Sequence, residues 1–298
     1  MSRTGAGQDA PDRTGAGQDA PDRARPGRVA PDRLVTGRGV PPLLAAPAAI
    51  GFCFLLVPLL ALLVRAPWHG LAGLLADPAA LTALRLSLEC ATAATAVSIV
   101  LGVPLAWVLA RARFPGLAVL RALVTVPLVL PPVVGGLALL LAFGRNGILG
   151  RYLDAWFGLT LPFSTAGVVM AETFVAMPFL VVTVEGALRS ADRELEEAAA
   201  TLGARRLTVF ARITLPLAAP SVLAGAVLCW ARALGEFGAT ITFAGNYPGA
   251  TQTMPLAVYD ALQTDPEPAI ALSLVLLLVA AGVLALLRDR WLRTGGNP

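Results

Sequence analysis

Six long apolar runs constrain this chain more than any of its other features. They cover residues 43–64, 81–110, 120–143, 165–188, 217–243 and 269–287. A helix needs about 20 apolar residues to cross the hydrocarbon core of a bilayer at a rise of about 1.5 Å per residue. Each run is close to that length or longer, and the second and fifth are long enough to be tilted or broken. The runs predict an all-α integral membrane protein, a polytopic bundle of about six transmembrane helices.

The composition agrees with a membrane protein and excludes several kinds of chemistry. Only 14% of the residues are charged, against about 25% in an average soluble domain. The chain has one histidine, His69, and three cysteines without metal-ligand spacing. It has no G-x-S-x-G and no G-x-x-x-x-G-K-[ST] motif. We therefore expect no catalytic residue, no metal site and no bound cofactor, and we expect contact with lipid but not with nucleic acid. Any ATP that drives this protein must be hydrolysed by another chain.

Residues 1–40 differ from the rest of the sequence. The segment 3–12 is repeated unchanged at 13–22, and a degenerate third copy follows at 23–32. Such a tail, rich in Gly, Pro, Asp and Arg and lacking aromatic residues, is predicted to be disordered. It is either a neutral extension or an arm that binds a protein. Residues 41–66 are predicted to form an additional N-terminal transmembrane helix, and residues 78–292 the main transmembrane domain.

The distribution of arginine predicts the orientation in the membrane. Alternate connections are rich in arginine: the tail with seven, then 111–121, 189–212 and 288–293. The opposite connections carry only Arg65 with Arg85, Arg145 with Arg151, and none between the last two runs. Because cytoplasmic loops are richer in Lys and Arg, both termini and the loop at 189–212 are predicted to face the cytoplasm. On the other side, 144–158 and 254–263 are predicted to form short helices at the membrane surface.

The loop before the fifth run carries a motif, E-A-A-x3-G-x9-I-x-L-P. Its residues are Glu197, Ala198, Ala199, Gly203, Ile213, Leu215 and Pro216. Residues 192–202 favour a first helix, which Gly203 would end in a left-handed conformation. Residues 205–214 favour a second helix, and Pro216 would start the next span. Small residues allow a partner to approach closely, Arg205 adds charge at the edge, and Glu197 can pair with an arginine of that partner. In the alternative interpretation, the loop is a simple hairpin that Gly and Pro only punctuate.

Two places inside the spans suggest a path through the membrane. The third run contains Pro127, Pro131, Pro132 and Gly135, and each internal proline frees a backbone carbonyl that lipid cannot satisfy. This run therefore either lines the path as a discontinuous span or is a packed, kinked helix. In the fifth run, Arg232 and Glu236 lie four residues apart on one face. They form either an ion pair that locks the helix or a source of positive potential for an anion.

Other acidic side chains lie within the runs. Glu89, Glu172 and Glu185 are expected near the ends of spans, where they can snorkel towards water.

Three segments resemble a known family. The loop motif resembles the cytoplasmic coupling loop of the permease subunits of bacterial binding-protein-dependent ABC importers. Residues 126–135 (VPLVLPPVVG) resemble molybdate permeases, and residues 231–240 (ARALGEFGAT) with 244–246 (AGN) resemble molybdate and sulfate permeases. The resemblance covers about residues 78–292 and implies a type I ABC importer permease fold. It also implies a homodimer in the bacterial inner membrane, two cytoplasmic ABC ATPase subunits that hold ATP and Mg²⁺, and an extracytoplasmic binding protein for molybdate or tungstate.

Other functions remain open from the sequence. Within the same family, the substrate could be sulfate or thiosulfate. A secondary transporter would be expected to show internal repeats and paired acidic residues at mid-depth, and a membrane enzyme would need a catalytic cluster. We find neither pattern in the sequence.

Overall fold

The structure is a computed structural model that describes residues 42–294. The repeat-containing tail at 1–40 lies outside the described residues. The described residues belong to two units, which divide between Phe54 and Leu55. Helix α1 (Pro42–Arg65) contains this boundary and lies where a helix was predicted, at 41–66. The other helices are α2 (Leu71–Leu75), α3 (Pro78–Arg111), α4 (Leu117–Val129), α5 (Pro132–Phe143), α6 (Gly150–Phe157), α7 (Thr165–Ser190), α8 (Glu194–Thr201), α9 (Arg206–Val209), the π-helical turn η1 (Phe210–Thr214), α10 (Leu215–Leu234), α11 (Gly238–Phe243), α12 (Met254–Thr264) and α13 (Pro266–Thr294).

The predicted number of spans is confirmed within the described residues. Five helices are long and apolar enough to cross a membrane, and the bent pair of α4 and α5 brings the number to six when it is counted as one span. The second run is one unbroken helix of 34 residues, α3. The fifth run is interrupted, because α10 ends at Leu234 and α11 begins at Gly238.

Local signals in the sequence explain where the long helices begin. Asp77 precedes α3, and its side chain accepts a hydrogen bond from the backbone N–H of Ala79 at 3.3 Å. Pro78 follows at the first helical position, where no N–H is needed. Ser164 caps α7 in the same way by accepting the N–H of Gly167 at 3.1 Å. These caps satisfy donors that the first helical turn would otherwise leave unpaired.

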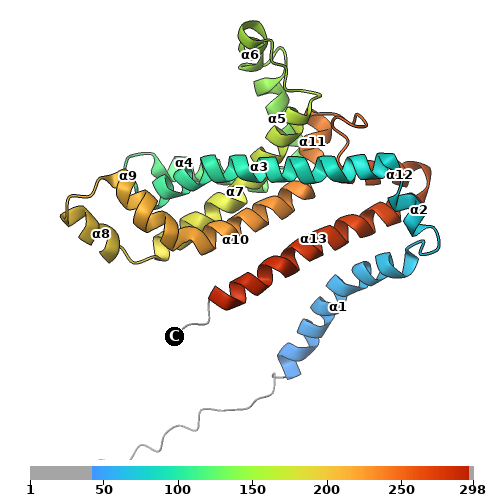
Figure 1. Cartoon of the computed structure of the whole chain (residues 1–298), viewed down its shortest axis with the longest axis horizontal. Coiled ribbons are helices and arrows are strands. Elements are labelled where there is room, and N and C mark those ends of the chain that lie inside the picture. Colours follow the sequence, from blue (N-terminus) through green and yellow to red (C-terminus); the bar gives the residue numbers. More distant parts are fainter. Residues whose placement is uncertain (1–41, 295–298) are drawn as a thin grey trace, which may run out of the picture. The chain divides into compact units, whose positions relative to one another are not determined.

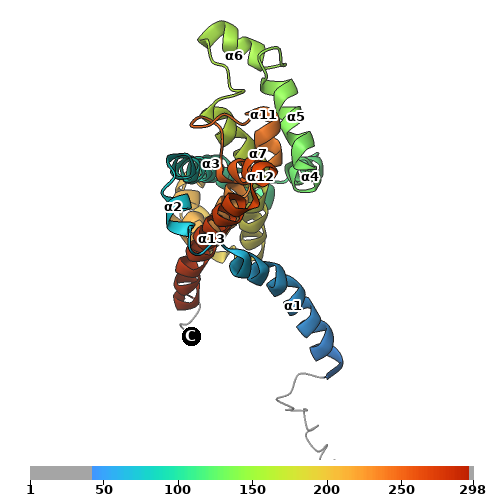
Figure 2. The ribbon, with the colours of Figure 1, turned by 90° about the vertical axis from the view of Figure 1, so that its right-hand side faces the viewer.

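The core of the second unit is the packing of α3, α7 and α10, which lie side by side (Figures 1 and 2). Small residues let these helices approach closely, as is common between membrane helices. A Cβ on Gly102 of α3 would lie 3.0 Å from Leu180 Cδ2, and a Cβ on Gly225 of α10 would lie 3.2 Å from Leu180 Cα. Leu180 of α7 is fully buried between them. The two glycines therefore set the spacing of the three helices.

The two short surface helices are present at the predicted places. Helix α6 falls within 144–158, and it exposes Trp156 and Phe157 to 73% and 74%. Helix α12 covers 254–264 and is close to the predicted bounds. In Figure 1, α6 lies at the far end of α5, away from the packing of α3 with α7.

The expectation that Glu172 and Glu185 snorkel towards water is wrong. Glu172 is 1% exposed in α7, and Glu185 is 6% exposed. Glu185 accepts a hydrogen bond from Arg121 Nε of α4 at 2.7 Å, so a partner on another helix holds it inside. Glu89 does lie at an exposed position, where it pairs with Arg85 at 2.6 Å. The burial of Glu172 and Glu185 depends on the helices packed around α7, which a single run of sequence does not show, whereas Glu89 pairs within its own helix.

Candidate coupling loop and translocation path

The predicted coupling loop begins directly after α7. The side chain of Asp192 accepts a hydrogen bond from the backbone N–H of Glu194 at 3.0 Å, where α8 starts. The first turn of α8 contains three acidic residues, which are favourable at the positive end of the helix dipole. Alanines and a threonine complete the helix, and they leave a narrow profile. The first predicted helix is therefore present, with shorter bounds than 192–202.

Gly203 ends α8 as predicted, in a left-handed conformation with φ of +84°. The N–H of Gly203 donates to the carbonyl of Ala200 at 3.0 Å, and the N–H of Ala204 donates to the carbonyl of Ala199 at 3.0 Å. This pair of bonds is a Schellman motif, which satisfies carbonyls at the end of the helix. No atom lies within 4 Å of a Cβ built on Gly203. Glycine is therefore required at position 203 for its backbone conformation, since there is room for a side chain.

The second half of the loop differs from the expected separate helix. Helix α9 continues through η1 into α10, and together they form one helix from Arg206 to Leu234. In the π turn, the N–H of Leu215 donates to the carbonyl of Phe210, five residues earlier. Pro216 follows directly and has no N–H to donate. Instead of starting a new helix, Pro216 is accommodated by a π turn, so the loop is continuous with the span.

An internal tether holds the loop against the spans. Glu196 Oε1 accepts hydrogen bonds from Arg111 Nη2, at the end of α3, and from Thr214 Oγ1, each at 2.9 Å. The side chains of Arg111 and Glu196 are 8% and 18% exposed. Trp107 of α3 also packs on Phe210 of η1, with ring centroids 5.5 Å apart. The sequence analysis placed Glu196 and Thr214 within the loop helices, but it did not predict this tether or the part of Arg111 in it.

The residues that the motif identified lie mostly on the outside of the loop. Glu197, Ala198, Gly203, Arg205 and Pro216 are exposed, and Ala199, Ile213 and Leu215 are partly buried. Three large apolar side chains are also exposed there, Leu195 to 58%, Leu202 to 88% and Leu207 to 77%. Exposed apolar side chains beside charged ones are typical of a protein interaction site. The loop therefore presents a mixed apolar and charged surface. Among the described residues, the Glu197 backbone carbonyl accepts a hydrogen bond from Thr201 Oγ1 at 2.9 Å, and the Glu197 carboxylate makes none.

The third span is discontinuous, which was one of the two predicted possibilities. Helices α4 and α5 meet at an angle of 119°. Leu130 and Pro131 are extended between them, Pro127 lies inside α4, and Pro132 begins α5. Within the second unit, α4 has no buried residue, and Val126, Val129 and Val133 are exposed. The break therefore leaves backbone and apolar side chains uncovered by the rest of this unit.

The break in the third span packs against the break in the fifth. A Cβ on Gly136 of α5 would lie 2.7 Å from Thr242 Cβ and 2.8 Å from the carbonyl oxygen of Ala239 on α11. A Cβ on Gly238 would lie 2.8 Å from Pro132 Cβ. Figures 1 and 2 both show α5 and α11 side by side. Gly135 is also buried, with its α-carbon turned towards Phe174 of α7. Gly136 and Gly238 thus join the predicted residues Pro132 and Gly135.

Arg232 and Glu236 form the ion pair that one interpretation predicted. Arg232 Nη1 lies 2.6 Å from Glu236 Oε2. Glu236 Oε1 accepts a hydrogen bond from the backbone N–H of Ala239 at 2.8 Å, in the first turn of α11. The Glu236 side chain is 1% exposed and that of Arg232 is 28% exposed. One carboxylate therefore links the last turn of α10 to the first turn of α11 and fixes the geometry of the break.

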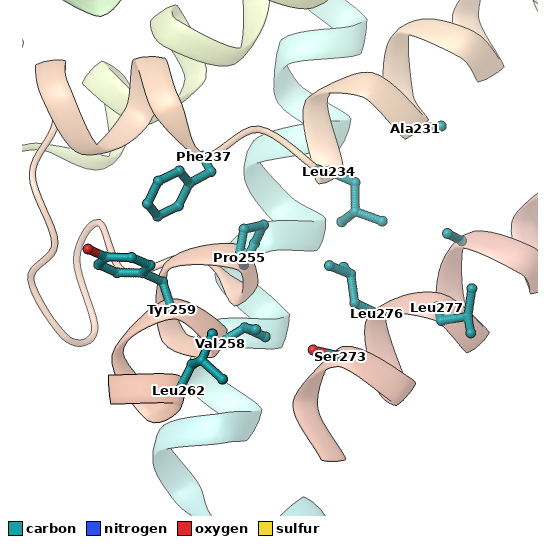
Figure 3. Close-up of a pocket in the computed structure, with 12 residues that line it drawn as sticks. Ala231, Leu234, Phe237, Pro255, Val258, Tyr259, Leu262, Ser273, Leu276 and Leu277 are labelled. Atoms are coloured by element: carbon teal, nitrogen blue, oxygen red, sulfur yellow. The ribbon is translucent and has the colours of Figure 1, made fainter. Parts of the chain in front are cut away.

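The opposite face of this break borders an apolar cavity of about 540 Å³ between α10, α12 and α13. Figure 3 shows Leu234 and Phe237, on either side of the break, together with Tyr259 of α12 and Leu276 of α13 around it. The rings of Phe237 and Tyr259 have centroids 5.0 Å apart. The break is thus held on one side by an ion pair and on the other by apolar side chains.

The comparison with known proteins gives the family. The family described as binding-protein-dependent transport system inner membrane component matches residues 98–294. The chain belongs to this family. It is therefore a membrane-spanning permease component of a transport system and not an enzyme, and the family assignment from the sequence is confirmed. The matched range contains the loop and both breaks.

Curated relatives match most of the chain. The molybdenum transport system permease protein ModB of Mycobacterium tuberculosis is 53% identical over 235 residues, which cover 79% of this chain and 89% of the relative. ModB of Escherichia coli K12 is 45% identical, with coverage of 70% and 92%. The sulfate transport system permease protein CysT of Salmonella typhimurium is 37% identical, with coverage of 78% and 84%.

Solved structures show the same fold. A bacterial ABC transporter for import of the acidic polysaccharide alginate matches with a TM-score of 0.67 at 19% identity, covering 84% of this chain and 95% of that chain. The MetNI methionine ABC transporter matches with a TM-score of 0.55 at 18% identity, covering 80% and 99%. At such identities the likeness establishes the fold, and it confirms the predicted importer permease architecture.

Proposed function

We propose that this chain is the permease subunit of an ATP-driven importer for molybdate, with tungstate as an equivalent substrate. The assignment of the substrate rests on sequence identity, which is 53% and 45% to two molybdenum permeases and 37% to a sulfate permease. Sulfate or thiosulfate import is the second candidate, because that permease also covers most of the chain. An ion-coupled secondary transporter is disfavoured by the family itself.

The loop at 192–214 is the site for an ATPase subunit in this proposal. The surface formed by Glu197, Ala198, Leu202 and Leu207 is exposed and mixed in character, as a docking surface requires. The arginine-rich connections support an orientation with this loop and both termini in the cytoplasm of a bacterial cell, and the permease in its inner membrane. Each permease copy would dock one ATPase, which holds ATP and Mg²⁺, so this chain itself binds no cofactor.

Two copies of the permease around a central path explain the uncovered break in the third span. Extended backbone at membrane depth is tolerated only against protein or along a water-filled cavity. Leu130 and Pro131 are extended, and Pro131 and Pro132 are exposed in the single chain. A second copy and the path between the two would supply that surrounding. We assign Pro127, Pro131, Pro132, Gly135, Arg232 and Glu236 to the path and its gate.

Transport in this proposal needs no bond chemistry from the permease. A separate extracytoplasmic binding protein delivers the oxyanion to the outer mouth and supplies most of the selectivity. ATP binding favours one arrangement of the spans over the other by a few kcal/mol, which is enough to reverse a two-state population. Hydrolysis restores the first arrangement.

A complementation experiment tests the substrate. A bacterial strain that lacks its molybdate permease would receive this gene together with the genes for its binding protein and ATPase. The activity of a molybdenum-dependent enzyme, measured at limiting molybdate, is expected to return, and uptake of labelled sulfate is expected to stay at background. Restored sulfate uptake without restored enzyme activity would favour the second candidate. Failure of both, with the protein present in the membrane, would refute oxyanion import.

A further inference from the structure

A charged cavity, distinct from the apolar cavity at the break, lies beside the loop. It has a volume of about 620 Å³ and lies between the end of α3, the residues that follow it, and α8 with α9. Six ionisable side chains contribute to its wall: Arg111, Arg113, Arg193, Arg206, Glu196 and Glu197. Four positive and two negative side chains leave the wall with a formal charge of +2. The wall therefore has the electrostatic character of an anion site.

Arg111 supplies an independent indication of a ligand. Its side chain is 8% exposed, and its Nη2 donates to Glu196 at 2.9 Å. Its Nε and Nη1 are buried and have no hydrogen-bond partner. A guanidinium carries five N–H donors in a planar fork, and a buried group with unpaired donors calls for an acceptor such as an ion. One carboxylate oxygen of Glu196, which Thr214 shares, does not satisfy this fork.

The geometry of guanidinium groups indicates the class of the acceptor. Arginine binds planar or tetrahedral oxyanions through two parallel hydrogen bonds, and phosphate is the common example. Basic pockets between spans on the cytoplasmic side of a membrane bind anionic lipid headgroups. Here Trp107 and Phe114 also line the cavity, and aromatic side chains are common at the level of the headgroups.

We propose that this cavity binds a phosphate-type oxyanion, supplied either by the headgroup of an anionic phospholipid or by a free oxyanion from the cytosol. The anion accepts from Arg111 and is neutralised by Arg113, Arg193 and Arg206 around it. Because Glu196 holds the same guanidinium, the anion and the loop tether share Arg111. The bound anion completes the coordination of Arg111 and stabilises the loop against α3. The proposal depends on the cytoplasmic orientation but not on the identity of the transported substrate.

The assembled transporter, permease with ATPase, is the material for the test. One arm adds phosphatidylglycerol or phosphatidylcholine to transporter stripped of lipid in a neutral detergent, and native mass spectrometry measures the lipid retained. The other arm measures binding of labelled inorganic phosphate by equilibrium dialysis without lipid. Preference for phosphatidylglycerol identifies the lipid as the source, and phosphate binding alone identifies a free oxyanion. The wild type is expected to show at least one of the two.

The double substitution Arg113→Gln with Arg206→Gln removes two wall charges and leaves the Arg111–Glu196 tether in place. It is expected to weaken the binding found in the wild type roughly thirtyfold. Its matched control is Arg189→Gln with Arg212→Gln, which removes two exposed arginines of the same region that do not line the cavity. This control is expected to bind as the wild type does. If the double substitution fails to assemble with the ATPase, Arg193→Gln alone takes its place, with an expected loss of roughly fivefold.

Three results would overturn the proposal. If the wild type shows neither a preference for phosphatidylglycerol nor phosphate binding, the cavity does not bind an anion in the assembled protein. This result is expected if a carboxylate of the ATPase occupies the cavity. Unchanged binding in the wall variants would place the anion elsewhere. Equal losses of binding in the wall variant and in its control would show that binding depends on the net charge of the region and not on this cavity. None of these results bears on molybdate uptake, so the two proposals fail independently.

Discussion

Replacing Glu196 by alanine is expected to release the candidate coupling loop, whereas the same change at the adjacent Glu197 is not. Glu196 is the partner of Arg111, which is 8% exposed, and the acceptor for Thr214, which is 2% exposed. Removing one member of a buried ion pair costs about 3–5 kcal/mol, and an unpaired buried hydroxyl adds about 1 kcal/mol. The Glu196 side chain is 18% exposed, so water can reach the site and the total is expected at about 3 kcal/mol.

This cost can be measured as the rate at which trypsin cuts the loop. Trypsin cleaves after arginine, and the loop contains Arg193, Arg205, Arg206 and Arg212. When opening and closing are fast, cleavage follows the population of the open loop. A loss of about 3 kcal/mol raises that population about a hundredfold. In permease embedded in lipid nanodiscs, Glu196→Ala should be cut about a hundred times faster than the wild type, and Glu197→Ala within about twofold of it.

Two further variants show whether the tether is the cause. Glu196→Gln keeps an oxygen acceptor but loses the charge, so its cleavage rate should lie between those of the wild type and the alanine variant. Arg111→Met combined with Glu196→Leu removes both charges, and it should be cut more slowly than Glu196→Ala alone, because no buried cation is left unpaired. Equal cleavage of Glu196→Ala and Glu197→Ala, or a double variant that is no better than the single one, would refute the tether.

Three other substitutions test the remaining geometry. Gly203→Ala places a side chain at φ of +84°, costs about 1–2 kcal/mol and should lower ATP-driven uptake. Gly203→Asn should retain more uptake, and Gly186→Ala, in open space in α7, should leave uptake unchanged. Equal uptake by the three variants would contradict the requirement for glycine at 203. Gly136→Ala forces a Cβ to within 2.7 Å of Thr242 and should lower thermal stability by about 1–3 kcal/mol, whereas Gly282→Ala, which contacts nothing, should not lower it. Arg232→Gln leaves the carboxylate of Glu236, 1% exposed, without its cation and should destabilise the protein by about 3 kcal/mol. The double variant Arg232→Gln with Glu236→Gln should be destabilised less. A double variant that is less stable than the single one would show that the ion pair does not hold the break.

Features set by local chemistry were predicted from the sequence alone. The apolar runs and the left-handed Gly203 follow from span length and backbone sterics, and the missing N–H of proline made a broken third span one of two interpretations. All of these depend on residues close together in the chain, and the structure contains all of them.

Features that depend on distant partners were not predicted. Glu196 and Glu197 are both acidic and adjacent, and about 100° of helix rotation separates them. Which one turns inwards depends on Arg111, 85 residues earlier in the chain. The burial of Glu185 likewise depends on Arg121, 64 residues away. Pro216 was expected to separate the loop from the span, because a proline usually begins a helix, and the π turn that accommodates it has no recognised sequence signal.

The continuity of α9 with α10 gives the loop a direct mechanical connection to the break in the fifth span. The helix from Arg206 to Leu234 contains 29 residues and is therefore about 40 Å long. One end of it belongs to the loop, where Glu196 ties it to α3 through Thr214. The other end stops at Gly235, where Glu236 joins it to α11 and α11 packs on α5 through Gly136. A flexible joint at Pro216 would have absorbed a displacement of the loop, whereas a continuous helix carries it to the place where the two discontinuous spans meet. The correction to the predicted loop therefore strengthens the case that a motion driven by an ATPase at the loop reaches the candidate gate.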